Sequence, residues 1–218
     1  MSRGQLNING NNIELKGEVA NESQRQQLAA DMATALNPTY SVRNAHCHDL
    51  TVLSQPDPGT RGHAVARELI EQVILFSARP TLVLPCSGSF DVPCQNVMVA
   101  WDGSREAARA VADALPLLRK ARQVNVVAWQ EKGLLTGSRP VKLNEVCKWL
   151  AWHGVSADAH LETASVPIAQ AMLSRAADLD TDLVVMGAYG HTRWAERMLG
   201  GATRGVLASM TVPVLMSH

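Results

Sequence analysis

The feature that most constrains the fold is a regular alternation of strand and helix patterns from residue 96 onward. Short runs rich in valine alternate with longer segments in which apolar residues recur at helical spacing. Strands are predicted at 96–101, 123–129, 156–162, 182–187 and 212–217. Helices are predicted over about 104–118, 140–153, 167–179 and 202–210. Because strands that alternate with helices form parallel sheets, we predict an α/β protein with a doubly wound, Rossmann-like parallel sheet.

The length of 218 residues fits poorly with either one domain or two, since a domain averages about 150 residues. An internal similarity explains this length. A predicted strand, helix and strand at 48–55, 63–77 and 79–85 repeat the end of the chain at a constant offset of 133 residues. The matched identities are Asp49 with Asp182, Leu50 with Leu183, Val52 with Val185, Val73 with Val206, Pro80 with Pro213 and Leu82 with Leu215. We therefore predict a truncated first repeat at 46–90, before a complete domain at 95–218.

Residues 1–45 do not fit this repeat and are of uncertain origin. A strand is predicted at 12–19, a helix at 21–36 and a returning strand at 39–44. This β-α-β pattern resembles part of a BON-type (bacterial osmotic and nodulation) domain. The alternative is a degenerate piece of the first repeat, and both interpretations remain open.

Composition argues against several classes of partner. Twenty basic and twenty acidic side chains cancel, so no overall field attracts nucleic acid or an anionic membrane. No apolar run approaches the roughly 20 residues of a membrane span, and the first residues lack the apolar core of a signal peptide. We predict a cytoplasmic protein without nucleic-acid or membrane partners. Its four cysteines form no C-x-x-C pair and are expected to be reduced thiols without a metal.

A cluster of glycines at 186–207 is the most suggestive chemical feature. Gly187 ends a predicted strand, Gly190 follows, and Gly200 precedes a predicted helix. Glycines let a ligand approach the backbone, and the N–H groups of a helix N-terminus suit phosphate oxygens. Asp102, after the first strand, could accept a hydrogen bond from a ribose hydroxyl. The sequence thus indicates a mononucleotide pocket; the alternatives are close helix packing for the glycines and helix capping for Asp102.

The spacing G-x2-G-x9-G from Gly187 to Gly200, after DLVVMG and before a helix and VPVLMSH, resembles the universal stress protein family. VMVAWDGSREAARAV resembles the first strand and helix of that family. The resemblance covers residues 96–218 as a complete domain, with 46–88 similar to the last third of a preceding one. It implies a fold of the adenine nucleotide alpha hydrolase type and binding of ATP, with Mg²⁺, in a stress-response protein.

In ATP-binding members of that family, the resemblance implies a role for each matching position. The residues concerned are Ala100 and Asp102 on the adenine and ribose side, Val127 beside the base, Met186, Gly187 and Gly190 beside ribose and phosphates, and Gly200, Gly201, Ala202 and Thr203 at the phosphates. The family usually has serine or threonine after the third glycine, whereas this chain has Gly201. The lost hydrogen bond to a charged group would cost about 1.5–3 kcal/mol, leaving backbone N–H groups to hold the phosphates.

The first repeat has Ser54, Asp57 and Arg67 where the second has its three glycines. We therefore expect the first repeat to bind no nucleotide and to have a structural role. Because terminal strands in this family commonly pair between domains, the resemblance implies a homodimer or an intrachain pseudo-dimer.

Three functions are open. The first is a nucleotide-responsive regulatory protein without strong catalytic activity, and the second is a nucleotide-free dimerising scaffold of the same fold. The third is a slow ATPase or phosphotransferase. The third is disfavoured because the chain has no G-x-x-x-x-G-K-[ST] loop and no readable nucleophile–base pair.

Overall fold

A computed structural model describes residues 4–9, 12–17, 48–57, 63–88, 90, 94–131, 142–190 and 201–218. The chain divides into two compact units, Met1–Cys86 and Ser87–His218, and each is described by itself. Within the described ranges, no helix combines the length and the apolar character needed to cross a membrane.

The second unit is built on a parallel sheet. Its strands are β5 (Asn96–Ala100), β6 (Gln123–Glu131), β7 (Asp158–Ala164), β8 (Leu183–Gly187) and β9 (Val214–Ser217). They lie side by side in the order β9-β8-β5-β6-β7, and every described pairing among them is parallel. The predicted α/β fold with a parallel sheet is thereby confirmed.

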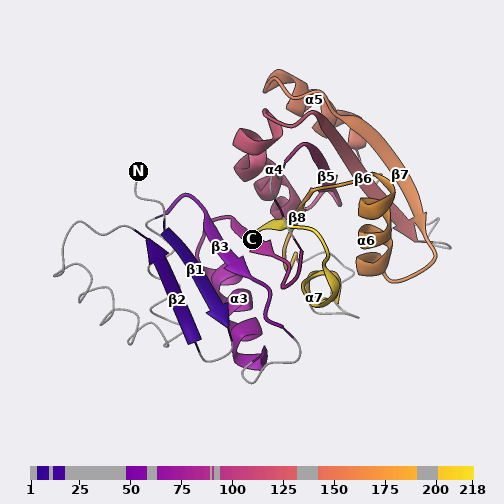
Figure 1. Ribbon diagram of the computed structural model, residues 1–218. Helices are drawn as coiled ribbons and strands as arrows, with labels where there is room; N and C mark the ends of the chain where they lie inside the picture. The colour runs from indigo at the N-terminus through magenta and orange to yellow at the C-terminus, as the bar shows by residue number, and fades with distance from the viewer. Residues whose placement is uncertain are drawn as a thin grey trace. The chain divides into compact units, whose positions relative to one another are not determined.

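Four helices cover this sheet. They are α4 (Arg105–Leu118), α5 (Leu143–Trp152), α6 (Ile168–Asp178) and α7 (Gly201–Ser209). The connections through α4 and α5 lead from β5 toward β7, whereas those through α6 and α7 lead back toward β9. Because such crossovers are right-handed, the two pairs of helices cover opposite faces (Figure 1). The direction of connection reverses between β5 and β8, which is where ligands bind in open α/β sheets.

Valine-rich strands form the core of this unit, as expected for strands covered on both faces. In β5, Val97, Met98 and Val99 are fully buried. Helix α4 contributes a stripe of mostly small residues at helical spacing, which lets it lie close to the sheet. The stripe consists of Ala107, Ala110, Val111, Ala114 and Leu118.

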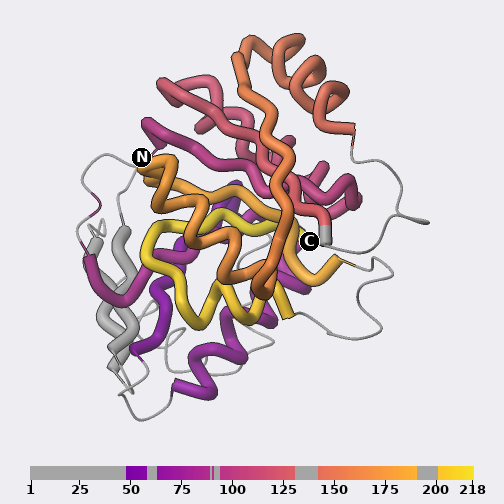
Figure 2. Tube along the Cα trace, turned by 90° about the vertical axis from the view of Figure 1, so that its right-hand side faces the viewer, coloured from indigo at the N-terminus to yellow at the C-terminus, as the bar shows by residue number. Residues whose placement is uncertain are grey.

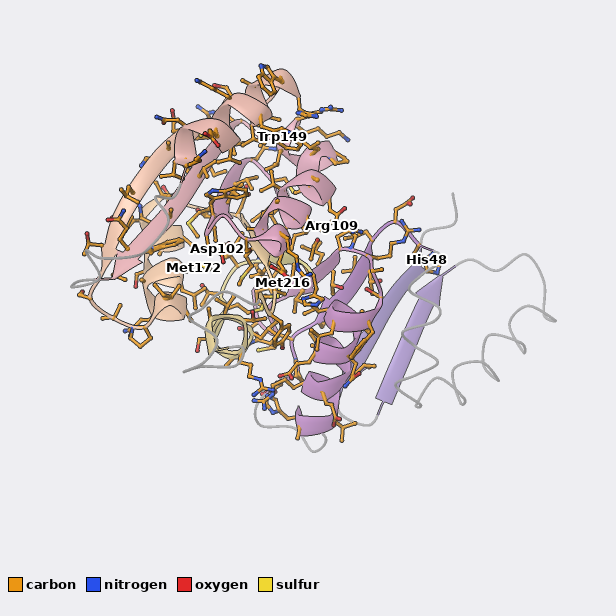
Figure 3. The ribbon with its side chains drawn as sticks, turned by 180° about the vertical axis from the view of Figure 1, so that it is seen from behind. His48, Asp102, Arg109, Trp149, Met172 and Met216 are labelled. Atoms are coloured by element: carbon orange, nitrogen blue, oxygen red, sulfur yellow. The ribbon has the colours of Figure 1, made fainter. Side chains whose placement is uncertain are left out.

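Polar contacts attach the helices to the sheet and to one another. The hydroxyl of Ser217, buried on β9, donates to Asp113 Oδ2 of α4 at 2.9 Å, and Arg109 Nε donates to the same oxygen at 2.9 Å. The side chain of Arg109 is labelled in Figure 3. On the other face, α6 and α7 run side by side (orange and yellow in Figure 2). A Cβ on Gly205 would lie only 2.6 Å from the Cβ of Ala169, so this crossing has no room for a larger residue.

The first unit contains a shorter arrangement. Strands β3 (Thr51–Ser54) and β4 (Thr81–Leu84) are parallel and are connected through α3 (His63–Phe76). The β3–β4 register pairs Thr51 with Thr81, and the β8–β9 register pairs Val184 with Val214, at the offset of 133 found in the sequence. Descent of the two units from one repeat stays a prediction.

The first unit also contains an antiparallel pair that sequence reasoning only half anticipated. Strands β1 (Gly4–Asn9) and β2 (Asn12–Gly17) pair so that Asn9 lies opposite Asn12. Only the second of these strands was predicted. The missed signal is Gly10-Asn11 between two runs of alternating polarity, because a Gly-Asn pair at this place favours a two-residue hairpin. The predicted helix at 21–36 and strand at 39–44 lie outside the described residues.

The carboxylate of Asp182 fixes the start of strand β5. Asp182 precedes β8, and its two oxygens accept backbone N–H groups of Cys94, Gln95 and Asn96 at 2.9, 2.7 and 3.2 Å. Hydrogen bonds to charged acceptors are stronger than neutral ones, so this side chain ties β5 to β8 before the two strands pair.

We expect Asp182→Ala to destabilise the protein by about 1–3 kcal/mol, because it removes the acceptor of three charge-assisted hydrogen bonds. Asp182→Asn, which keeps one acceptor oxygen, should lose roughly half as much. Urea unfolding measures both changes, and Asp178→Ala on the exposed side of α6 is the control. Equal stabilities for Asp182→Ala and the control would contradict the assignment.

Candidate functional site

The strand registers bring the predicted residues of the sheet into one row. Ala100 of β5 pairs with Val127 of β6 on one side and with Met186 of β8 on the other. All of these side chains are buried, Val127 completely and Met186 to 4% exposure. These three side chains therefore lie below the strand ends where the sheet connections reverse direction. A ligand bound at this edge of the sheet would lie above them.

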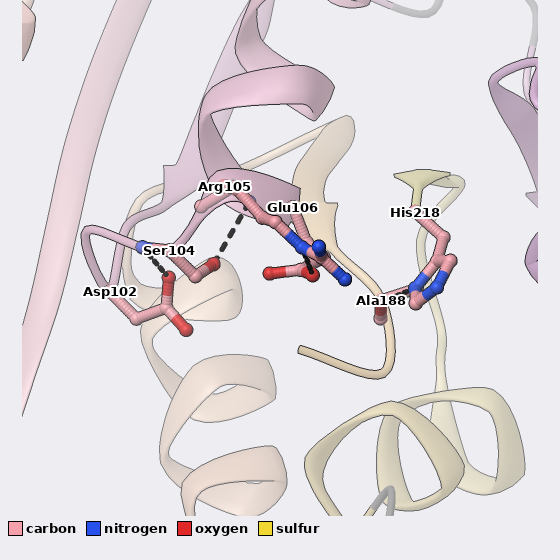
Figure 4. A network of polar contacts seen from close by, with 7 residues as sticks. Asp102, Ser104, Arg105, Glu106, Ala188 and His218 are labelled. Atoms are coloured by element: carbon pink, nitrogen blue, oxygen red, sulfur yellow. Dashed lines mark hydrogen bonds and ion pairs between the residues drawn. The ribbon is translucent and has the colours of Figure 1, made fainter. Parts of the chain in front are cut away.

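The turn after β5 is held by its own polar groups. Asp102 Oδ1 accepts the N–H of Ser104 at 2.9 Å, and Ser104 Oγ caps α4 by accepting the N–H of Ala107 at 3.0 Å (Figure 4). One oxygen of Asp102 is thus engaged in the turn. Its side chain is exposed, and no described residue hydrogen-bonds Oδ2, so this oxygen could still accept a ligand hydroxyl.

Gly187, at the end of β8, is required by close packing against α4. A Cβ at this position would lie 2.5 Å from the backbone nitrogen of Ala107 and 2.6 Å from the carbonyl carbon of Glu106. Both atoms belong to the first turn of the helix and cannot move alone. The absence of a side chain at Gly187 therefore allows the helix, rather than a ligand, to approach the strand.

The segment after β8 runs between the first turns of α4 and α7. A Cβ on Gly190 would lie 3.2 Å from Glu106 Oε2 and 3.7 Å from Ser104 Oγ, both of α4. Tyr189 adopts a left-handed backbone conformation, with φ of +53°, and donates its N–H to Thr203 Oγ1 of α7 at 3.1 Å. This bond fixes the segment against the second helix.

The N-terminus of α7 supplies backbone donors at this site. Gly201, Ala202 and Thr203 form its first turn, where N–H groups lack acceptors within the helix. Ala202 is exposed, whereas Thr203 is buried and its hydroxyl oxygen already accepts from Tyr189. The predicted Gly200 lies outside the described residues, as do the other residues of 191–200.

Glu106 is a carboxylate that sequence reasoning missed. It lies in the first turn of α4 at 3% exposure, and its Oε1 accepts Arg105 Nε (Figure 4). Burial alone would raise the pKa of this carboxyl. The hydrogen bonds from Arg105 and from the backbone N–H of Glu106, together with the charges of Arg105 and His218, outweigh burial and lower its pKa below the usual value. Glu106 is therefore ionised at neutral pH.

The imidazole of His218 lies near the Glu106 carboxylate. Its Nδ1 donates to the carbonyl of Ala188, directly after β8, at 2.9 Å, and the Ala188 N–H donates to Ser217 at 2.9 Å. Among the described residues, no group of three or more His, Cys, Asp or Glu side chains is arranged to hold a metal ion. The Arg105–Glu106 ion pair and the imidazole of His218 thus lie together above the strand ends.

Comparison with known proteins identifies the family. The family model described as the universal stress protein family matches residues 93–218, more than half of the chain. The chain belongs to the universal stress protein family. No curated protein sequence matches it.

Solved structures with TM-scores above 0.5 show the same fold at low identity. A universal stress protein from Archaeoglobus fulgidus DSM 4304 matches with 18% identity and a TM-score of 0.63, covering 83% of this chain. The matched part is 64% of that protein, so this chain spans a little under two thirds of its length. A functionally unknown protein from Pseudomonas aeruginosa PAO1 matches with 17% identity, a TM-score of 0.57 and coverage of 92% and 79% of the two chains. An Archaeoglobus fulgidus universal stress protein in complex with dAMP has 21% identity, a TM-score of 0.45 and coverage of 59% and 98%.

Substitution of Gly187 by alanine should destabilise this universal stress protein domain by about 1–3 kcal/mol or more, because the new methyl group would meet the backbone of α4. Gly190→Ala should cost less than about 1 kcal/mol, since its nearest contact would be Glu106 Oε2 at 3.2 Å, which requires a shift of only a few tenths of an ångström. Thermal or urea unfolding in the absence of ligand separates the two. Similar losses at both glycines would contradict the packing role of Gly187.

The stabilisation that Glu106 provides should depend on pH. Because its folded pKa lies below the unfolded value of about 4.3, the stabilisation is complete above that value and is lost as the pH falls through the folded pKa. The difference in unfolding free energy between wild type and Glu106→Gln should be constant from about pH 7 to 5.5 and change in favour of the variant between about pH 5 and 3. A difference that stays flat to pH 3 would contradict this assignment.

Proposed function

We propose that this chain is an adenine-nucleotide-binding regulatory protein of the stress response, without strong catalytic activity. The observation that carries the proposal is the convergence of three elements where the sheet connections reverse. The exposed Asp102 follows β5, the segment through Gly190 follows β8, and the first turn of α7 presents backbone N–H groups. Family membership supports the same function.

The described residues fit a nucleotide that approaches from above the strand ends. Ala100 has only a methyl group at the end of β5, and Asp102 Oδ2 could accept a ribose hydroxyl. The partial positive charge at the N-terminus of α7 suits phosphate oxygens, although Gly201 brings no hydroxyl. The Thr203 hydroxyl oxygen already accepts from Tyr189, so phosphate binding would depend on backbone N–H groups.

A nucleotide-free scaffold is the second candidate, and one observation favours it. The N-terminus of α4, the other helix end at this point, is filled by side chains of the chain itself: Ser104, Asp102 and the Glu106 carboxylate. Among the described residues, the first turn of α7 is therefore the main source of backbone donors for a phosphate. The same titration that tests nucleotide binding decides between the two candidates.

A charge placed in the first turn of α7 is the most direct test. We expect calorimetric titration of the wild type with ATP and Mg²⁺ to give a dissociation constant below 1 mM, about −4 kcal/mol or stronger. Ala202→Glu should weaken binding by about tenfold or more, since it places a carboxylate where phosphate oxygens would lie. The substitution should not unfold the helix, because acidic residues are favourable in a first helical turn.

Ala208→Glu is the matched control, because it places the same charge on an exposed position at the other end of α7. Its nucleotide affinity should stay within about threefold of the wild type. If the titration gives no heat of binding at ATP concentrations below 1 mM, the nucleotide-free scaffold would instead be favoured. Release of ADP during long incubation would support the slow ATPase.

A further inference from the structure

We propose that Glu106 determines how much negative charge the site accepts, so that adenosine and its monophosphate are preferred to the triphosphate. The inference rests on the proposed function and deepens it. It assigns to this chain a specificity-determining residue in the first turn of α4, on the side of the site opposite to the donors of α7.

Position is the first argument. Glu106 Oε2 lies 3.2 Å from where a Cβ of Gly190 would be, so the carboxylate borders the segment expected beside the phosphates. Figure 4 shows the carboxylate between the first turn of α4 and the segment at Ala188. At 3% exposure, this charge is little screened by water and cannot turn away into solvent.

The hydrogen bonds around α4 are the second argument. A free helix N-terminus would offer N–H groups to a phosphate, but here several of these groups already have acceptors within the chain. The N–H of Ser104 donates to Asp102, that of Ala107 to Ser104 Oγ, and that of Ala108 to the Ser104 carbonyl. The Glu106 carboxylate interacts with its own N–H, so the helix end already holds an anion.

Charge is the third argument. Arg105 pairs with Glu106, but its side chain is 75% exposed and offsets the buried charge only in part. Adenosine carries no phosphate charge, AMP about two negative charges and ATP up to four. At the dielectric of a protein surface, one unit charge several ångströms away changes an affinity by about tenfold, so repulsion increases from adenosine to ATP.

The test is a calorimetric series with adenosine, AMP, ADP and ATP in magnesium-free buffer at pH 7.5, on the wild type and Glu106→Gln. We expect the wild type to bind ATP more weakly than AMP. In Glu106→Gln the affinity for ATP should rise by about tenfold or more, while that for adenosine changes by less than about threefold. Glu145→Gln, which removes the same charge from an exposed ion pair on α5, should leave the ratio of the two affinities unchanged.

The outcomes separate the two proposals. If the ligands bind but Glu106→Gln changes the affinities for adenosine and ATP by the same factor, the role of Glu106 is wrong and the proposed function stands. If neither protein binds any of the four ligands, the proposed function fails and the inference fails with it. Should Glu106→Gln not fold, as judged by circular dichroism, the wild type decides alone. Binding of ATP tenfold tighter than AMP would then overturn the inference.

Discussion

The close approach of α4 to the end of β8 is the contact on which the rest of the second unit depends. It is possible because Gly187 has no side chain and because the helix presents alanines to the sheet. The approach brings the first turn of α4 over the ends of the two central strands. It also buries Glu106 there, since the same turn carries this side chain against the segment that follows β8. The packing of α4 on β8 and the burial of the Glu106 charge thus both result from this close approach.

The two helix N-termini at this point differ in what they can bind. In α4, capping side chains and the Glu106 carboxylate satisfy the first turn from within the chain. In α7, the described first turn contains only small residues, and the Thr203 hydroxyl oxygen is turned toward Tyr189. The N-terminus of α4 therefore carries a negative side chain, whereas the N-terminus of α7 has the partial positive charge of a helix end. Under the proposed function, this arrangement would favour adenine ligands of low negative charge over those with many phosphate charges.

Most of the sheet and its helices could be predicted because the apolar periodicities are strong and the strands are buried on both faces. The hairpin at Gly4–Gly17 was only half predicted, since Gly10-Asn11 was not interpreted as a turn. At the site, the sequence placed Ala100, Val127 and Met186 at the ends of three strands, but strand order alone makes them neighbours. Glu106 was missed because a glutamate in a first helical turn is common, and its burial depends on how closely the helix approaches the sheet.

The glycines therefore carry less direct information about ligands than their spacing suggests. Gly187 is explained by helix packing before any nucleotide is considered. The equivalent position in the first unit is Ser54, at the end of β3, where a Cβ is present. A helix could not lie against that strand end as α4 lies against β8 without a backbone shift.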